Sequence, residues 1–152
     1  MRRKDKEIKD KKEIESIINR AEVCRIALSE NNMPYIIPVN YGYKNNCLYI
    51  HSSLVGKKID IIKKNNNVCF EMDIDHELCL SEDPCASSMK YRCVVGFGKA
   101  IVMDNLQEKQ EALDNIMNHY FPKTNHKYNE KLIKKLVIIK IIIQNMRIIK
   151  SV

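Results

Sequence analysis

Residues 34–73 read PYIIPVNYGYKNNCLYIHSSLVGKKIDIIKKNNNVCFEMD, and this stretch decides the fold. Its first ten residues, up to Tyr43, are rich in β-branched and aromatic side chains, which favour a strand. Pro38 cannot donate to a strand ladder, so we expect this strand at a sheet edge or with a bulge. Lys44-Asn45-Asn46 is typical of a turn, and the segment from Cys47 to His51 is predicted to return as the second arm of a hairpin.

The rest of this stretch predicts a short helix and another strand. Gly56 to Lys64 reads GKKIDIIKK, which places Ile59 and Ile62 on an inward face and the lysines outward. Val68 to Asp75 has the composition of a strand. The order is therefore strand, hairpin, helix and strand, without the strict alternation of parallel α/β folds.

The flanking sequence extends this pattern. Ile14, Ile17, Ile18 and Ala21 recur at helical spacing, and Asp10 or a nearby residue is expected to cap that helix. The remaining predicted elements are a strand at 23–28, a loop at 76–88, a strand at 90–103 with Gly96 and Gly98 at a bulge or close backbone approach, a helix at 106–120, a helical turn at 129–134 and a strand at 136–149. Six strands with peripheral helices predict a mainly β fold, a closed or half-open antiparallel barrel.

Length and composition set further limits. We expect 152 residues to form a single domain, 1–152, with residues 1–12 as a charged lead-in. The longest apolar run, Leu136 to Ile143, is too short for a membrane helix, and no signal peptide is visible, so we expect a cytoplasmic protein. The net charge is +7, but the lysines are scattered and not interleaved with aromatic residues, so a nucleic-acid partner is not expected.

The six cysteines are interpreted as structural thiols and not as metal ligands. They are Cys24, Cys47, Cys69, Cys79, Cys85 and Cys93, without a CxxC spacing, and no metal site is predicted. Gly56-Lys57-Lys58 lacks the earlier glycine and the following Ser/Thr of a phosphate loop, and Gly96-Phe97-Gly98 lacks the third glycine of a dinucleotide fingerprint. The GxSxG and HExxH motifs of hydrolases are also missing.

Several motifs resemble a known family in the order in which that family carries them. They are the opening MRRKD, P-x-x-x-P-V-N-Y-G-Y from Pro34, L-Y-x-H-S from Leu48, G-K-K-I-D from Gly56, V-C-F-E from Val68 and Y-R-x-V-x-G-F-G-K-A from Tyr91. The chain resembles the FMN-binding split-barrel proteins related to pyridoxamine 5'-phosphate oxidase, and within them the nitroimidazole-reductase (Nim-type) branch. This resemblance implies a six-stranded antiparallel split β-barrel that binds FMN as a homodimer.

The residues around the hairpin end also suit a flavin phosphate. His51, Ser52 and Ser53 lead into a helix whose first turn carries Lys57 and Lys58. Helix N-terminal N–H groups, hydroxyls and two ammonium groups together form a suitable phosphate site. The alternative is a serine cap followed by a solvated lysine face.

The resemblance implies roles for further residues. Pro38, Val39, Asn40 and Tyr41 match a strand that lies against the flavin ring, although barrel packing is the alternative. His51 matches a histidine beside flavin and substrate, as a catalytic or a structural residue. Arg92, Gly96, Phe97, Gly98 and Lys99 match a segment that completes the pocket in similar dimers, although Arg92 is equally suited to a structural ion pair.

The implied activity is an FMN-dependent oxidoreductase. It would reduce a small organic acceptor, such as a nitroaromatic compound, with NAD(P)H as donor. The alternatives are a flavin carrier or redox sensor without turnover, a pyridoxamine-phosphate-oxidase-like enzyme, and the same barrel with haem or a deazaflavin.

Overall fold

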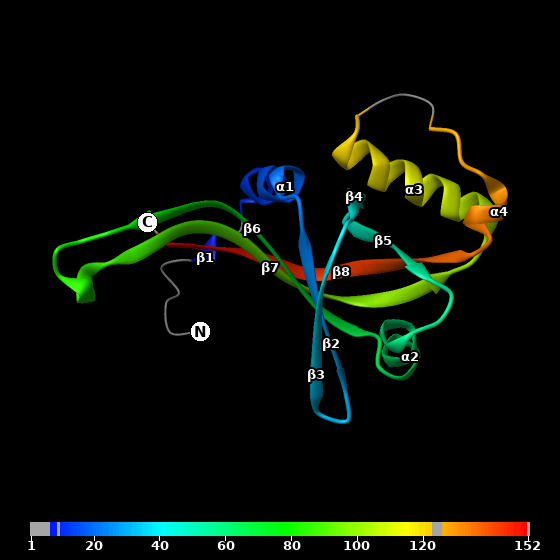
Figure 1. The fold of residues 1–152 in the computed structure, drawn as a ribbon, viewed down its shortest axis with the longest axis horizontal. Coiled ribbons are helices and arrows are strands. Elements are labelled where there is room, and N and C mark those ends of the chain that lie inside the picture. Colours follow the sequence, from blue (N-terminus) through cyan, green and yellow to red (C-terminus); the bar gives the residue numbers. More distant parts are fainter. Residues whose placement is uncertain (1–6, 9, 123–125, 152) are drawn as a thin grey trace.

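The computed structural model describes residues 7–8, 10–122 and 126–151. The elements are β1 (Glu7–Ile8), α1 (Lys11–Arg20), β2 (Cys24–Glu30), β3 (Met33–Val39), β4 (Gly42–Lys44), β5 (Cys47–Ser53), α2 (Lys57–Lys64), β6 (Asn67–Cys79), a 3-10 turn (Pro84–Ala86), β7 (Ser88–Met103), α3 (Leu106–Tyr120), α4 (Glu130–Ile133) and β8 (Leu136–Ser151). Figure 1 shows α1 and α3 above the sheet and α2 below it.

All strands belong to one antiparallel sheet that is not closed by hydrogen bonds. The order is β3-β2-β6-β7-β8-β5-β4, and β1 pairs with β8 beside this path. The predicted mainly β fold with peripheral helices is confirmed, but the predicted number of six strands is wrong. The described residues add β1, and the segment 33–44 forms two strands where one was predicted.

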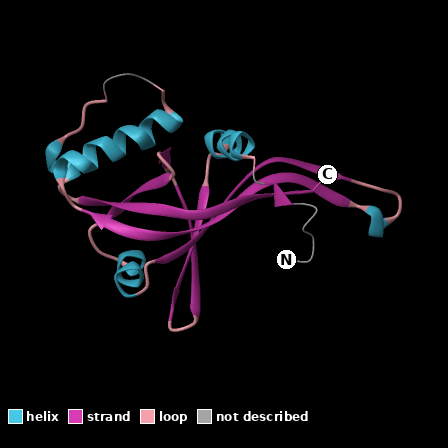
Figure 2. Ribbon diagram, turned by 180° about the vertical axis from the view of Figure 1, so that it is seen from behind, coloured by secondary structure: helices cyan, strands magenta, loops and turns pink. Residues whose placement is uncertain are grey.

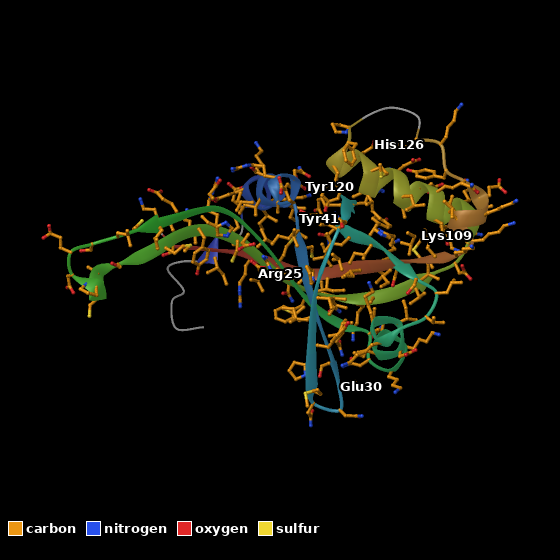
Figure 3. All side chains as sticks on the ribbon, in the orientation of Figure 1. Arg25, Glu30, Tyr41, Lys109, Tyr120 and His126 are labelled. Atoms are coloured by element: carbon orange, nitrogen blue, oxygen red, sulfur yellow. The ribbon has the colours of Figure 1, made fainter. Side chains whose placement is uncertain are left out.

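Tyr41 is the reason for the break between β3 and β4. Its side chain is 0% exposed, and its hydroxyl donates to the carbonyl oxygens of Ile18 (2.5 Å) and Ala21 (2.9 Å) at the end of α1. The Tyr41 N–H donates to the Tyr120 hydroxyl on α3 at 3.2 Å (Figure 3). Because Tyr41 is held by two helices, β3 stays paired with β2 while β4 pairs with β5.

The helices cover the sheet through two apolar clusters. Asp10 caps α1, as predicted, by accepting from the Lys12 N–H at 2.9 Å. In the main core, Ile17 of α1 and Ile59 and Ile62 of α2 pack with side chains from most strands. A second cluster joins Ala112 and Ile116 of α3 to Ile138 of β8, with Tyr49 at its margin.

A long hairpin of β6 and β7 extends from the body as an arm, with the last part of β8 beside it (Figures 1 and 2). The predicted loop at 76–88 is therefore wrong at both ends, because after a bulge the pairing resumes from Glu77↔Lys90 to Cys79↔Ser88. Asp75 lies in this bulge with φ of 57°. It accepts hydrogen bonds from Arg20 and Arg92, which explains the irregular backbone where the sequence lacks a glycine.

The structure also bears on the cysteines, on the charged N-terminal segment and on the expected lack of a membrane helix. The six cysteines are free thiols, and no group of three or more potential ligands capable of holding a metal occurs among the described residues. The predicted lead-in contributes β1 and the start of α1, while 1–6, and with them the MRRKD motif, lie outside the described residues. Within the described part of the chain, no helix is both long and apolar enough to cross a membrane.

Candidate functional site

The site lies where the sheet is open. β8 pairs with β5 along its whole length, from Cys47 to Ser53, whereas β4 covers only Cys47 to Tyr49 on the other side. The end of β5, which carries His51, therefore has no strand on that side. β3 is the other edge of the sheet, as Pro38 predicted.

A pocket of about 460 Å³ lies between these two open strands. It is lined by Tyr35, Ile37 and Pro38 of β3, by His51, Ser52 and Ser53 of β5, and by Val55 to Ile59 at the start of α2. The structure therefore brings together six of the predicted site residues: Pro38, His51, Ser52, Ser53, Lys57 and Lys58.

The N-terminus of α2 forms one wall and leaves its first amides free of helix bonds. The first backbone bond of this helix runs from the Asp60 N–H to the Gly56 carbonyl oxygen at 3.1 Å, so the N–H groups of residues 57–59 precede the helical ladder. Gly56 is the N-cap and offers no side chain to them. The Ser53 hydroxyl donates to the Val55 carbonyl oxygen at 2.6 Å and tightens the turn.

Two lysines place positive charge at this helix end. The Lys57 ammonium lies 4.7 Å from the centroid of the Tyr35 ring, so a cation–π contact holds it beside β3. Burial lowers the pKa of Lys58 from its usual 10.5, and no carboxylate contributes to the shift. A half-buried ammonium without an acidic partner favours an anion in the pocket.

His51 stands on the opposite wall from Tyr35, and its imidazole is biased toward the neutral form. Burial is the larger cause of its lowered pKa, and the charge of Lys58 is the second. A neutral imidazole both donates and accepts a hydrogen bond, which suits proton transfer or substrate orientation.

Three residues of the motif that begins at Pro34, which were predicted to lie against the flavin ring, are outside the pocket: Val39, Asn40 and Tyr41. Val39 packs partly buried against the main core, and the Tyr41 side chain is committed to α1. Asn40 is exposed between β3 and β4. In this region the structure favours packing for Val39 and Tyr41, the alternative that the sequence left open.

The motif that begins at Tyr91, with Arg92 and residues 96–99, is also outside the pocket of its own chain. Arg92 lies on the arm and donates through Nε to Asp75 at 2.8 Å, which is the ion-pair alternative for this residue. Gly96 is required by packing, because a Cβ there would lie 2.2 Å from the Phe70 ring. Gly98 would place a Cβ 2.5 Å from the Ile142 carbonyl oxygen, which confirms the predicted close approach.

Phe97 and Lys99 lie on the outer face of β7. Phe97 is 44% exposed, and the Lys99 ammonium donates to the Asn67 side-chain oxygen on β6. Neither residue lines the pocket of its own chain.

Sequence reasoning missed Tyr35, Ile37, Val55 and Ile59 as lining residues. A usable signal for the first two was the two-residue alternation of a strand, which places them on the same face as Val39. Val55 and Ile59 flank the predicted lysines, so the same turn that brings Lys57 and Lys58 to the pocket brings these apolar groups with them.

Solved structures share this architecture. A protein of Bacteroides thetaiotaomicron VPI-5482, described as "a putative 5-nitroimidazole antibiotic resistance protein", is 34% identical with a TM-score of 0.83, covering 93% of this chain and 84% of that one. The flavocytochrome Anf3 of Azotobacter vinelandii has a TM-score of 0.87 at 15% identity, covering 100% and 72%. The FAD and heme binding protein of Mycobacterium smegmatis has a TM-score of 0.86 at 16% identity, covering 96% and 73%. At such low identity the last two show the fold alone.

Sequence comparison gives one short match and one long match. Protein RA0666 of Rhizobium meliloti (strain 1021), described as uncharacterized, is 28% identical over 65 residues, which is 43% of this chain and 42% of that protein. A family model with the description "Pyridoxamine 5'-phosphate oxidase" matches residues 10–147 of this chain. Because this match spans nearly the whole described chain, the protein belongs to the pyridoxamine 5'-phosphate oxidase family.

Proposed function

We propose that this protein is an FMN-dependent reductase that passes reducing equivalents from NAD(P)H to a small organic acceptor, such as a nitroimidazole. The observation that carries the proposal is the pocket in the open side of the sheet, where two lysines that form no ion pair with the carboxylates of the described residues meet the free N-terminus of α2. When bound, FMN supplies the redox chemistry, and the protein binds and orients it.

The phosphate of FMN fits the α2 end of the pocket. The free amides of α2, the ammonium groups of Lys57 and Lys58, and the Ser52 hydroxyl are all suited to an anion, whereas the Ser53 hydroxyl donates to the Val55 carbonyl oxygen and shapes the turn. Gly56 keeps a side chain out of the approach to these amides. The residues that line this end of the pocket include no carboxylate, since Asp60 of the first turn of α2 is not among them, and this favours a phosphate dianion.

The remaining pocket residues suit the ring system and the acceptor. Tyr35, Ile37 and Pro38 give the β3 wall an apolar surface on which a planar group can lie. The backbone of Val39 and Asn40 continues this edge and would offer polar groups to the ring. His51 faces the same space as a neutral imidazole, and we assign it the role of orienting the acceptor or donating a proton to it.

A second copy of the chain is proposed to complete the site. Ile36, Ala27, Cys69 and Phe97 are cross-strand partners that form one continuous row over β3, β2, β6 and β7. Ile36 is 64% exposed and Phe97 44%, so this row presents apolar surface to solvent in one chain. An isologous dimer would cover it and would bring Phe97 and Lys99 toward the partner's pocket.

The nitroaromatic acceptor rests on one relative. The protein of Bacteroides thetaiotaomicron, 34% identical over most of both chains, carries 5-nitroimidazole resistance in its description. We extend this substrate class to the present chain as part of the proposal.

The test uses protein purified without added cofactor. We expect a flavin absorbance spectrum, release of FMN identified by mass, a dimer in sedimentation, and oxidation of NADH or NADPH that depends on a 5-nitroimidazole. Bound flavin that never turns over would favour the carrier or sensor alternative. A colourless monomer that does not bind added FMN would contradict the proposal.

A further inference from the structure

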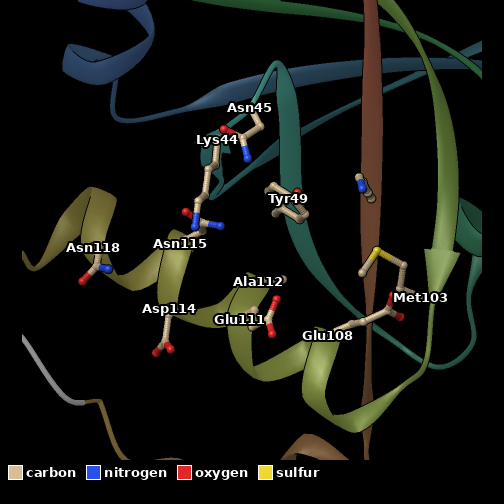
Figure 4. A pocket seen from close by; sticks show the side chains of 11 residues that line it. Lys44, Asn45, Tyr49, Met103, Glu108, Glu111, Ala112, Asp114, Asn115 and Asn118 are labelled. Atoms are coloured by element: carbon tan, nitrogen blue, oxygen red, sulfur yellow. The ribbon is translucent and has the colours of Figure 1, made fainter.

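A second groove lies beside the first half of β5, between α3 and the strands β4, β5 and β8 (Figure 4). Its volume is about 350 Å³, at the lower end of the range of pockets that bind small organic molecules. Six of its lining residues matter here: Lys44, Tyr49, Glu108, Glu111, Ala112 and Lys140. None of them lines the proposed flavin pocket.

Close packing of α3 on β4 fixes the width of this groove. A Cβ on Gly42 would lie 2.6 Å from the Asn115 carbonyl carbon, so helix and strand touch backbone to backbone at this point. Ala112 and Ile116 anchor the same helix on Ile138 of β8. The groove is therefore a preformed feature of the packed body.

Its two walls carry opposite charges. Lys44 from β4 and Lys140 from β8 line the sheet side, and the Lys140 ammonium lies 5.8 Å from the centroid of the Tyr49 ring. Glu108 and Glu111 line the helix side at a spacing of three residues, which places them on one face of α3. Among the residues that the structure describes, neither lysine forms an ion pair within 4 Å with either glutamate, although all four border one cavity.

The acidic wall retains acceptor capacity for a ligand. Glu111 accepts one hydrogen bond, from the Gln107 side-chain amide at 3.3 Å, and its carboxylate points into the groove in Figure 4. Asp114 also borders the groove, but it accepts from the Tyr128 hydroxyl at 2.7 Å, and its carboxylate points away. Glu108 and Glu111 are therefore the acceptors that face the cavity.

From this arrangement we infer that the groove binds a small zwitterion, a free α-amino acid with an apolar side chain. The ammonium group of the ligand is placed between Glu108 and Glu111, and its carboxylate between Lys44 and Lys140. The Tyr49 ring and the Ala112 methyl group form an apolar floor for its side chain. A plain anion would meet two carboxylates and a diamine would meet two ammonium groups, so the separated charges favour a molecule that carries both.

The test compares L-leucine with two derivatives that keep its side chain but each lose one charged group: N-acetyl-L-leucine, which lacks the ammonium group, and L-leucinamide, which lacks the carboxylate. Binding to the purified full chain is measured by isothermal titration calorimetry. We expect L-leucine to bind and each derivative, which lacks one charge, to bind at least ten-fold more weakly. Equal binding of the three, or no binding of L-leucine at 10 mM, would overturn the inference.

Charge-removing variants test the assignment of each wall. Glu111→Gln should weaken L-leucine binding about ten-fold and leave N-acetyl-L-leucine unchanged, whereas Lys44→Met should weaken L-leucine and leave L-leucinamide unchanged. Glu130→Gln and Lys131→Met on α4 are the matched controls, because both residues are exposed and outside the groove. Equal losses of L-leucine affinity in the groove variants and in the controls would contradict an amino-acid site in the groove. The flavin content of each sample, measured by absorbance, reports on the proposed reductase independently.

Discussion

The charge of Lys58 reaches His51 across the pocket between β3 and β5, where it adds to burial in lowering the pKa of the His51 imidazole. Lys58 comes from the first turn of α2 and His51 from the end of β5, and both line the same cavity. The positive charge at the start of α2 therefore influences the protonation of His51, the residue proposed to orient the acceptor.

This coupling predicts a defined pH dependence. The pKa of His51 should lie below its usual 6.5 in the folded protein and rise in Lys58→Met, while staying below 6.5 because burial is the larger cause. Because the folded state disfavours the charged imidazole, His51 should reduce stability as the pH falls below 6.5. NMR titration of the His51 ring protons measures the pKa in the wild-type protein and in Lys58→Met. A pKa that stays constant or falls in the variant would contradict the effect of the Lys58 charge.

Gly56 should be irreplaceable for reasons of backbone conformation. Its φ of 132° and ψ of 166° lie in a region that is essentially restricted to glycine, while the space around a Cβ is open. Gly56→Ala should therefore lower the free energy of unfolding by about 1–3 kcal/mol and weaken FMN binding through the shifted turn. Urea denaturation measures the free energy of unfolding. The neighbouring variant Val55→Ala is the control, because Val55 is 76% exposed, and its free energy of unfolding should lie within about 0.5 kcal/mol of wild type.

Tyr41 should matter for stability and not for the cofactor. Tyr41→Phe removes the donor to two carbonyl oxygens at the end of α1 and should cost about 1–3 kcal/mol of unfolding free energy. FMN affinity of the folded variant should match wild type. A variant with normal stability but weakened FMN binding would instead place the Tyr41 hydroxyl in the flavin site.

Gly96 should be required because a side chain at this position would collide with the Phe70 ring. Gly96→Ala forces a methyl group into the Phe70 ring and should destabilise the protein by about 1–3 kcal/mol. Phe70→Leu in the same chain makes room, so the double variant should lose less stability than the sum of the single losses. Strict additivity in thermal denaturation would show that the Phe70 contact is not the reason for this glycine.

Local sequence signals predicted the elements that are set by short-range patterning. The isoleucine spacing of α1 and α2, the Asp10 cap and the Lys44–Asn46 turn were all readable, because each depends on residues within a few positions. The division of segment 33–44 was not readable, since it depends on a Tyr41 hydroxyl that reaches the end of α1. The two ends of the arm were missed for a similar reason: a bulge at Asp75, whose carboxylate binds Arg20 and Arg92, lets the strand pairing continue into both ends of the expected loop.

The candidate site was predicted in part. The family motifs from Leu48 and Gly56 predicted five site residues that are close in sequence and meet in one pocket: His51, Ser52, Ser53, Lys57 and Lys58. The lining residues Tyr35 and Ile37 share a strand face that the two-residue alternation could have indicated, but their meeting with the end of β5 depends on contacts between segments distant in sequence. Phe97 and Lys99 lie outside the pocket of their own chain, and only the proposed dimer would bring them to a pocket.

The most direct test of the account compares the affinities of FMN and riboflavin, which differ only in the phosphate. Wild-type protein should bind FMN about 100-fold more tightly, a net difference of about 2.7 kcal/mol, which is comparable to one charge-assisted hydrogen bond of about 1.5–3 kcal/mol. In the double variant Lys57→Met and Lys58→Met this preference should fall to less than about ten-fold, with riboflavin affinity unchanged. Equal affinity of the wild-type protein for the two flavins would contradict the phosphate site on which the proposed function depends.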